Sequence, residues 1–208
     1  MKFFFACIFS LSILSCKEVT NKPATDTLRR TDTNINTGNE LVSPYAGIDI
    51  SPLDIIYFPS DYPVLKMSQK AEGLPVARVI YSRPHKQGRE IFGALIPYNE
   101  PWRLGANEAT EIEFFQPVNI QGKRVSTGKY ILYCIPQENK WIIVFNTNIY
   151  TWGLKQDATK DVFRFEIPTQ KATRSFEYFT MTFDKSPTGA VLFMSWDNVT
   201  AQLPITIQ

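Results

Sequence analysis

The segment from Ser82 to Thr110 carries the highest density of side chains able to bind a ligand. It contains Arg83, Arg89 and Arg103, and a guanidinium group binds carboxylates, phosphates or sulfates through two parallel hydrogen bonds. The indole of Trp102 supplies a flat apolar face on which a sugar ring can stack. Further polar groups in the segment that can direct hydrogen bonds are Asn107, Glu108 and Thr110. Together these residues predict a site for a glycan or an anionic small molecule.

The same residues have a second interpretation that needs no ligand. Arg89, Arg103, Asn107 and Glu108 would then form an internal network of ion pairs and hydrogen bonds that fixes a long loop. In such a network Arg103→Ala leaves a buried acceptor unpaired and costs about 3–5 kcal/mol of stability. Trp102, in a Pro-Trp-Arg turn, is expected to be partly exposed, so Trp102→Ala is expected to leave stability nearly unchanged.

The sequence contains no common catalytic or metal-binding motif. It has no Gly-x-Ser-x-Gly, no Gly-rich phosphate loop, no His-Glu-x-x-His and no calcium loop of the Asp-x-Asp-x-Asp-Gly type. Its one histidine, His85, is expected in a solvated turn. We therefore expect neither a cofactor nor a metal. A glycosidase needs two facing carboxylates, and the sequence gives no reason to pair any two of Asp54, Glu90, Glu108, Glu111 and Asp197.

The N-terminus predicts a lipoprotein signal. Lys2 gives a short basic region, and residues 3–14 form an apolar run that is shorter than the roughly 20 residues of a membrane-spanning helix. The run ends in Ile13-Leu14-Ser15-Cys16, which resembles the lipobox cut by signal peptidase II. We expect residues 1–15 to be removed and Cys16 to be acylated, which would anchor the protein in the cell envelope, at the outer membrane.

Residues 16–40 are expected to form a lipidated, disordered tether. After the cysteine they are rich in Thr, Asn, Asp, Lys and Arg, and they cannot bury enough apolar surface to offset the entropy of ordering. Asp26-Thr27-Leu28 resembles the O-glycosylation site of Bacteroidota, so Thr27 is a glycosylation candidate. A single folded domain is expected over residues 41–208.

The cysteine positions predict a domain without an internal disulfide. Cys7 leaves with the signal and Cys16 is acylated, so Cys134 alone remains in the folded part. Cys134 lies in an apolar, strand-like run, which favours a buried core residue over a nucleophile.

Overall charge excludes a nucleic-acid-binding protein. The 208 residues include 22 Lys+Arg and 20 Asp+Glu, for a formal net charge of +2. A nucleic-acid-binding surface needs a concentrated excess of basic residues. The length suits one domain with a substantial core.

Strand-like segments fill the expected domain. Residues 109–114 and 162–167 alternate polar and apolar side chains with a period of two. Other segments rich in β-branched and aromatic residues are 76–82, 129–135, 141–145, 176–183, 190–196 and 201–207. Turn signals separate them about every 8–12 residues, which predicts an all-β, antiparallel, jelly-roll-like β-sandwich without a major helix. Trp141, Trp152 and Trp196 are expected in the core or on a sheet face.

A set of longer motifs resembles a known family. The most specific stretch reads Trp-Arg-Leu-Gly-Ala-Asn-Glu-Ala-Thr over residues 102–110. Shorter matching motifs are Ser51-Pro52-Leu53-Asp54, Tyr81-Ser82-Arg83-Pro84, Trp152-Gly153, Asp161-Val162-Phe163-Arg164 and Ser195-Trp196-Asp197. Over residues 51–207 the chain resembles DUF2911, a bacterial family of proteins of unknown function. The resemblance implies a secreted or lipid-anchored β-rich domain of Bacteroidota-type bacteria and implies no activity.

These patterns lead to one expected function and two alternatives. The expected protein is anchored to the membrane through Cys16, and its non-catalytic domain binds a glycan, an anionic small molecule or an envelope protein partner. The first alternative is a hydrolase acting on sugars or peptidoglycan fragments. The second is a structural subunit of an outer-membrane complex.

Overall fold

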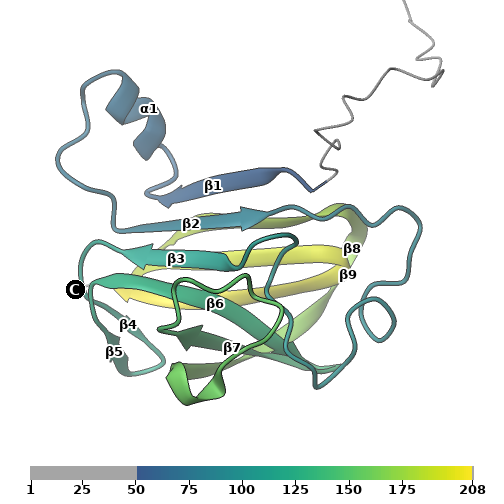
Figure 1. The fold of residues 1–208 in the computed structure, drawn as a ribbon. Coiled ribbons are helices and arrows are strands. Elements are labelled where there is room, and N and C mark those ends of the chain that lie inside the picture. Colours follow the sequence, from purple (N-terminus) through teal and green to yellow (C-terminus); the bar gives the residue numbers. More distant parts are fainter. Residues whose placement is uncertain (1–50, 208) are drawn as a thin grey trace, which may run out of the picture. The chain divides into compact units, whose positions relative to one another are not determined.

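The computed structural model describes residues 51–207, and these residues form nine strands joined by loops and very short helices (Figure 1). The strands are β1 (Leu53–Phe58), β2 (Ala77–Ser82), β3 (Thr110–Phe114), β4 (Val118–Ile120), β5 (Lys123–Val125), β6 (Gly128–Pro136), β7 (Lys140–Asn146), β8 (Asp161–Ser186) and β9 (Gly189–Ile207). The helices are α1 (Tyr62–Met67) and the 3₁₀ turn η1 (Ala158–Lys160).

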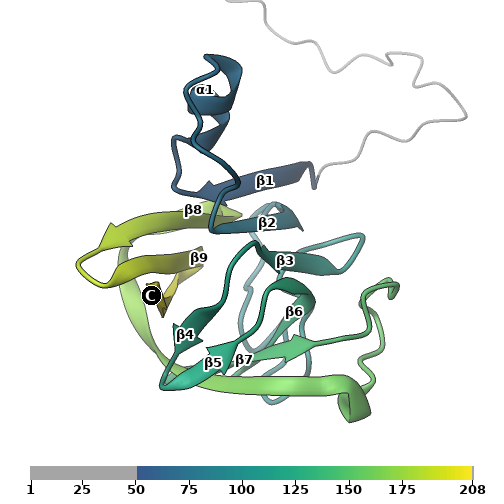
Figure 2. The same ribbon diagram turned by 90° about the vertical axis from the view of Figure 1, so that its left-hand side faces the viewer.

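One long strand connects the two layers of the fold. The strand order is β1-β2-β3-β6-β7-β8-β9-β4-β5, with antiparallel neighbours. Residues 161–168 of β8 pair with β7, whereas residues 169–186 pair with β9. Figure 2 shows β8 curving round one side of the molecule, so that the sheet folds back on itself. Apolar side chains meet between the two layers, as where Tyr81 of β2 contacts Phe179 of β8 edge-on. The predicted all-β sandwich is confirmed.

The strand predictions are mostly confirmed, with one systematic difference. The segments expected at 76–82, 109–114, 129–135 and 141–145 correspond to β2, β3, β6 and β7. The segments expected at 162–167 and 176–183 are parts of the single strand β8, and those at 190–196 and 201–207 are parts of β9. In β8, Thr169 to Lys171 pair with β9, and the register then shifts between Lys171 and Phe176 and between Phe176 and Thr180. Strand β1 has no counterpart among the predicted segments.

Aromatic side chains dominate the core. Trp141 and Trp196 are buried, as predicted. Trp152 is 55% exposed, so the prediction that it packs in the core is wrong: it lies in the loop after β7 and not in a strand. Cys134 on β6 is a free, fully buried cysteine, which confirms the prediction for this residue.

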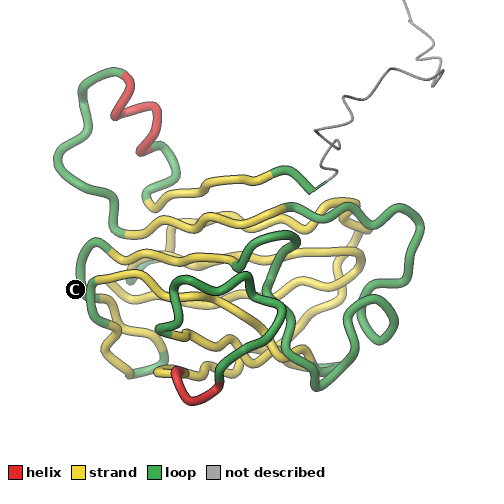
Figure 3. The backbone as a smooth tube through the Cα atoms, in the orientation of Figure 1, coloured by secondary structure: helices red, strands yellow, loops and turns green. Residues whose placement is uncertain are grey.

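Two long loops lie outside the sheet, residues 83–109 after β2 and residues 147–157 after β7 (Figure 3). The only α-helix within residues 51–207 is α1, which has six residues. None of the helices in this part of the chain has the length and apolar character needed to cross a membrane.

A buried carboxylate holds the end of the loop that follows β7. The Asp161 side chain is 7% exposed, and it accepts hydrogen bonds from the Tyr133 hydroxyl at 2.8 and 2.9 Å and from the Asn146 amide at 2.8 Å. Arg164 forms an ion pair with the same carboxylate at 2.8 Å. Burial, with the adjacent carboxylate, raises the pKa of Tyr133 above its usual range, which keeps this phenol a hydrogen-bond donor. The Asp-Val-Phe-Arg motif therefore fixes β8 against β6 and β7.

Several sequence predictions concern residues outside the described range. They are the signal peptide over residues 1–15, the acylated Cys16, the tether to residue 40, the glycosylation candidate Thr27 and the domain boundary at residue 41.

Candidate functional site

The loop of residues 83–109 is anchored on the sheet through Trp102. The Trp102 amide donates to the Cys134 carbonyl at 2.7 Å, and the Cys134 amide donates back at 2.8 Å, so the loop briefly extends the sheet beside β6. The Trp102 ring is 6% exposed and packs among Phe92, Trp141 and Trp196. The prediction that Trp102 is partly exposed is wrong, because this main-chain pairing turns its side chain into the core.

The residues after Trp102 form a tight turn with unusual backbone angles. Leu104 and Asn107 both have positive φ, of +52° and +58°, and the Leu104 side chain is fully buried. Thr110 is buried as well, and its hydroxyl donates to the Leu104 carbonyl at 2.7 Å. At Gly105 a Cβ atom would lie 3.0 Å from the Ser82 carbonyl oxygen. The prediction of Thr110 as a ligand contact is therefore wrong: its hydroxyl closes this turn.

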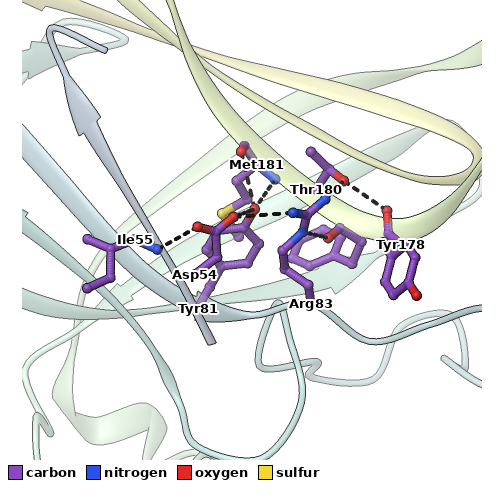
Figure 4. A network of polar contacts seen from close by, with 8 residues as sticks. Asp54, Ile55, Tyr81, Arg83, Tyr178, Thr180 and Met181 are labelled. Carbon is purple, nitrogen blue, oxygen red and sulfur yellow. Dashed lines mark hydrogen bonds and ion pairs between the residues drawn. The ribbon is translucent and has the colours of Figure 1, made fainter. Parts of the chain in front are cut away.

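Arg83 is also directed into the scaffold and away from the rest of the predicted site. Figure 4 shows its guanidinium between Asp54 and Thr180, with contacts of 3.5 Å to the carboxylate and 3.1 Å to the hydroxyl. Beside it the Tyr81 hydroxyl accepts from the Met181 amide at 2.8 Å, and burial raises the pKa of Tyr81 to about 12. These contacts join β1 and β2 to β8, so Arg83 is corrected from a ligand candidate to a structural residue.

Three other predicted residues, Arg89, Trp102 and Arg103, line one cavity of about 400 Å³. Its wall is built from the two long loops, from β9 and from Ser51 before β1. The lining residues are Ser51, Pro84, His85, Arg89, Leu95, Ile96, Pro101, Trp102, Arg103, Gly105, Ala106, Gly153, Leu154 and Trp196. The volume falls within the range of small-molecule sites. No aspartate or glutamate belongs to this wall.

Both guanidinium groups of the cavity lack a carboxylate partner among residues 51–207. Arg89 is exposed and donates to the main-chain carbonyls of His85 and Lys86. Arg103 is half-buried and donates to the carbonyl of Asn107. Burial lowers the pKa of Arg103, because water is removed from the charged group and no anion replaces it. Each group is therefore held by neutral acceptors and keeps its positive charge uncompensated.

The predicted internal network exists only in part. The Asn107 side chain reaches the Ser51 carbonyl at 3.5 Å, and its main chain receives Arg103. Glu108 is exposed and joins neither arginine. Neither Asn107 nor Glu108 belongs to the cavity wall, so the structure does not bring these two candidates to the site.

Sequence reasoning missed His85 as part of the site. Its ring stacks on Tyr178 with 4.5 Å between centroids and 7° between planes, and its Nε2 lies 2.8 Å from a carboxylate oxygen of Glu177. The expected solvated turn is thus wrong, because β8 supplies partners that lie far away in the sequence. The lining residues Leu95, Leu154 and Trp196 were also missed as site residues, and their spacing along the chain gives no signal that they meet.

Trp196 brings an unpaired donor to the cavity wall. Its side chain is 1% exposed, and its Nε1 is buried without a hydrogen-bond acceptor in the described part of the chain. Buried N–H groups are rarely left unpaired in folded proteins. The wall therefore contains two guanidinium groups without a carboxylate partner, Arg89 and Arg103, and one lining residue, Trp196, whose buried Nε1 has no acceptor in residues 51–207.

The carboxylates considered for glycoside hydrolysis are engaged elsewhere or exposed. Asp54 pairs with Arg83, Asp197 with Lys86 and Glu111 with Lys129. Within residues 51–207 there is also no group of three or more His, Cys, Asp or Glu side chains that could hold a metal ion. The geometry accordingly gives the hydrolase alternative no pair of facing carboxylates at this cavity.

Comparison with known proteins places the chain in a family without an assigned activity. No curated protein and no solved structure matches it. One family model, described as protein of unknown function (DUF2911), matches residues 63–205. This range includes β2 to β8, nearly all of β9 and both long loops of the cavity. Because the match covers more than half of the sequence, the chain belongs to the DUF2911 family.

Proposed function

We propose that this domain binds a small anionic ligand in the cavity between its two long loops, without catalysis. The observation that carries the proposal is the presence of Arg89 and Arg103 on one cavity wall that contains no carboxylate. A guanidinium without a counter-ion is a ready partner for a carboxylate, phosphate or sulfate, and a charge-assisted bond to it is worth about 1.5–3 kcal/mol.

The side chains that would bind the ligand are also preorganised. Hydrogen bonds to main-chain carbonyls hold both arginine side chains, and the turn around Leu104 is fixed by Thr110. Holding the binding groups in place lowers the entropy lost on association. A second cavity, of about 270 Å³, contains Glu166 and no cationic side chain in its wall, so it offers no comparable attraction for an anion.

The cellular setting in this proposal follows from the sequence. An acylated Cys16 and the tether to residue 40 would hold the domain at the cell envelope, where it would bind its ligand outside the cytoplasm. A glycan or an envelope protein as the partner remains a prediction from the sequence.

Titration of the full chain with small anions tests the binding proposal. Isothermal titration calorimetry with sulfate, phosphate, acetate, phenylacetate and glucuronate is expected to reveal at least one ligand. Arg103→Gln and Arg89→Gln are each expected to weaken its binding about tenfold or more. Arg124 of β5 provides the matched control, because it is an exposed arginine outside the cavity wall. The proposal is wrong if no anion binds, or if Arg124→Gln weakens binding as much as the cavity variants do.

A further inference from the structure

We infer that the ligand is an amphipathic anion, a carboxylate or similar charged group on an apolar body, and not a sugar acid. This inference rests on the proposed anion site and adds the chemistry of the part of the ligand that lies away from the charge. Its basis is the composition of the cavity wall beyond the two arginines.

Most of that wall is apolar. Leu95, Ile96, Pro101 and Leu154 contribute aliphatic surface, whereas the two indole side chains of the wall are only 6% and 1% exposed. Two of these aliphatic side chains are unusually exposed, Leu95 at 39% and Leu154 at 73%. Since they line the cavity, a ligand with an apolar body would remove their surface from water, which is favourable by about 25 cal/mol per Å².

Two exposed aromatic residues adjoin residues of the cavity wall. Trp152 is 55% exposed and directly precedes Gly153 and Leu154 of the wall. Tyr178 is 42% exposed and stacks on His85 of the wall. Two exposed aromatic residues are therefore close to the wall, Trp152 as the neighbour of Gly153 in the sequence and Tyr178 through its contact with His85.

The same wall is poorly suited to a polyhydroxylated ring. Each hydroxyl that is buried without a hydrogen-bond partner costs free energy, and sugar sites therefore need several side-chain acceptors and donors. The wall contains no Asp, Glu, Asn or Gln, and its polar side chains besides the arginines are Ser51, His85 and the two indoles. One of those indoles, Trp102, already donates to the Gly105 carbonyl at 3.3 Å. A sugar acid would leave most of its hydroxyls unpaired.

The donors of the wall suit one anionic group. Arg89 and Arg103 both belong to the lining residues and offer charged N–H groups. A carboxylate accepts several hydrogen bonds through its two oxygens. A ligand with one charged group at the arginines and an apolar body against Leu154 and Leu95 therefore matches both the cationic and the apolar part of the wall.

Four probe compounds separate charge from apolar contact in calorimetric titrations of the full chain. Phenylacetate carries both features, acetate carries only the charge, 2-phenylethanol only the ring, and glucuronate has the charge on a hydroxylated ring. We expect phenylacetate to bind at least about tenfold more tightly than each of the other three. Equal or tighter binding of glucuronate or acetate overturns this inference and leaves the proposed anion site standing. Equal binding of 2-phenylethanol overturns the anion site itself. Binding of none of the four overturns this inference, and the anion site is then decided by the titrations with sulfate and phosphate.

A matched pair of leucine variants tests the apolar contact directly. Leu154→Ser is expected to weaken phenylacetate binding about three- to tenfold and to leave acetate binding unchanged, because only the apolar contact is removed. Leu74→Ser is the control, since Leu74 is 72% exposed, as Leu154 is at 73%, and lies outside the cavity wall. Loss of affinity for acetate in Leu154→Ser, or an equal effect of Leu74→Ser on phenylacetate, contradicts the inference.

Discussion

Gly153 lies directly against Ala109, so the loop after β7 and the loop after β2 touch at their backbones. A Cβ atom added at Gly153 would stand 3.0 Å from the Ala109 Cα and 3.2 Å from the Arg103 Cβ. Gly153 also has a φ of +83°, a backbone conformation that side chains other than glycine rarely adopt. The Trp-Gly motif of the sequence is thereby explained as the place where the two walls of the cavity meet.

This contact predicts that Gly153→Ala destabilises the domain beyond the effect of backbone strain. Gly73→Ala is the matched control, because Gly73 has a φ of +88° and no atom within 4 Å of an added Cβ. Strain alone costs about 1 kcal/mol at either position. We expect chemical denaturation to show a larger loss of unfolding free energy for Gly153→Ala than for Gly73→Ala. Equal losses would mean that the two loops separate without cost.

Trp102, expected to be partly exposed, is buried, and Trp152, expected in the core or on a sheet face, is exposed. Trp102 is buried among aromatic rings, so Trp102→Ala is expected to cost about 3–5 kcal/mol of unfolding free energy. Trp152 is 55% exposed, and Trp152→Ala is expected to cost less than about 1 kcal/mol. Thermal melts of the two variants provide the measurement. Similar melting temperatures for both would contradict the packing described for the loop of residues 83–109.

The contrast between buried Trp102 and exposed Trp152 shows which features of the fold can be predicted from the local sequence. Period-two alternation identified strands such as β3, because successive side chains of a half-buried strand point alternately to the core and to solvent. The same reading cannot place Trp102, whose burial depends on main-chain pairing with Cys134, a residue remote in the sequence. It also divided β8 in two, since the polar residues after Pro168 interrupt the pattern, although Thr169 to Lys171 pair with β9 before the register shifts.

The sequence predicted the kind of side chain that the candidate site contains, but not the full set of residues that line it. Arg89 and Arg103 were identified because a guanidinium group can bind an anion through two parallel hydrogen bonds, and both line the cavity. Arg83 has the same chemistry, but the strand register places it between Asp54 and Thr180. The apolar wall, including Leu154, comes from a separate loop. Its contribution follows from tertiary packing alone, which no spacing along the chain encodes.

The buried carboxylate of Asp161 leads to a further stability prediction. Asp161→Ala would leave the Tyr133 hydroxyl without its acceptor and the Asn146 amide with only the Asp157 carbonyl, and each buried donor left unpaired costs about 1–3 kcal/mol. We expect urea denaturation to show a loss of several kcal/mol, and a smaller loss for Tyr133→Phe, which removes one donor. Asp184→Ala serves as the control, because Asp184 is exposed on the same strand. A loss no greater than that of Asp184→Ala would contradict the network.

The predicted membrane anchor has a direct test at Cys16. Metabolic labelling with an alkyne fatty acid is expected to mark the protein, and Cys16→Ser is expected to abolish the label and leave the signal uncleaved. Cys134→Ser is the matched control, because it removes a buried cysteine and leaves the lipobox intact. Undiminished labelling of Cys16→Ser would refute acylation at this residue and with it the proposed envelope location.

Cys134 is expected to be inert toward thiol reagents while the domain stays folded. It is fully buried on β6, and burial raises the pKa of its thiol well above the usual value, so the reactive thiolate is scarce at pH 8. Alkylation by iodoacetamide, followed by mass spectrometry of the Cys134 peptide, should therefore be slow in buffer and rapid in urea. Rapid labelling of the native protein would contradict the core position.

The raised pKa of Cys134 also determines how the stability of the domain depends on pH. Above the ordinary cysteine pKa the unfolded chain loses this proton while the folded chain keeps it, so stability falls as pH rises. Cys134→Ala should remove this part of the alkaline destabilisation, and an unchanged pH profile between pH 8 and pH 10 would contradict the assignment.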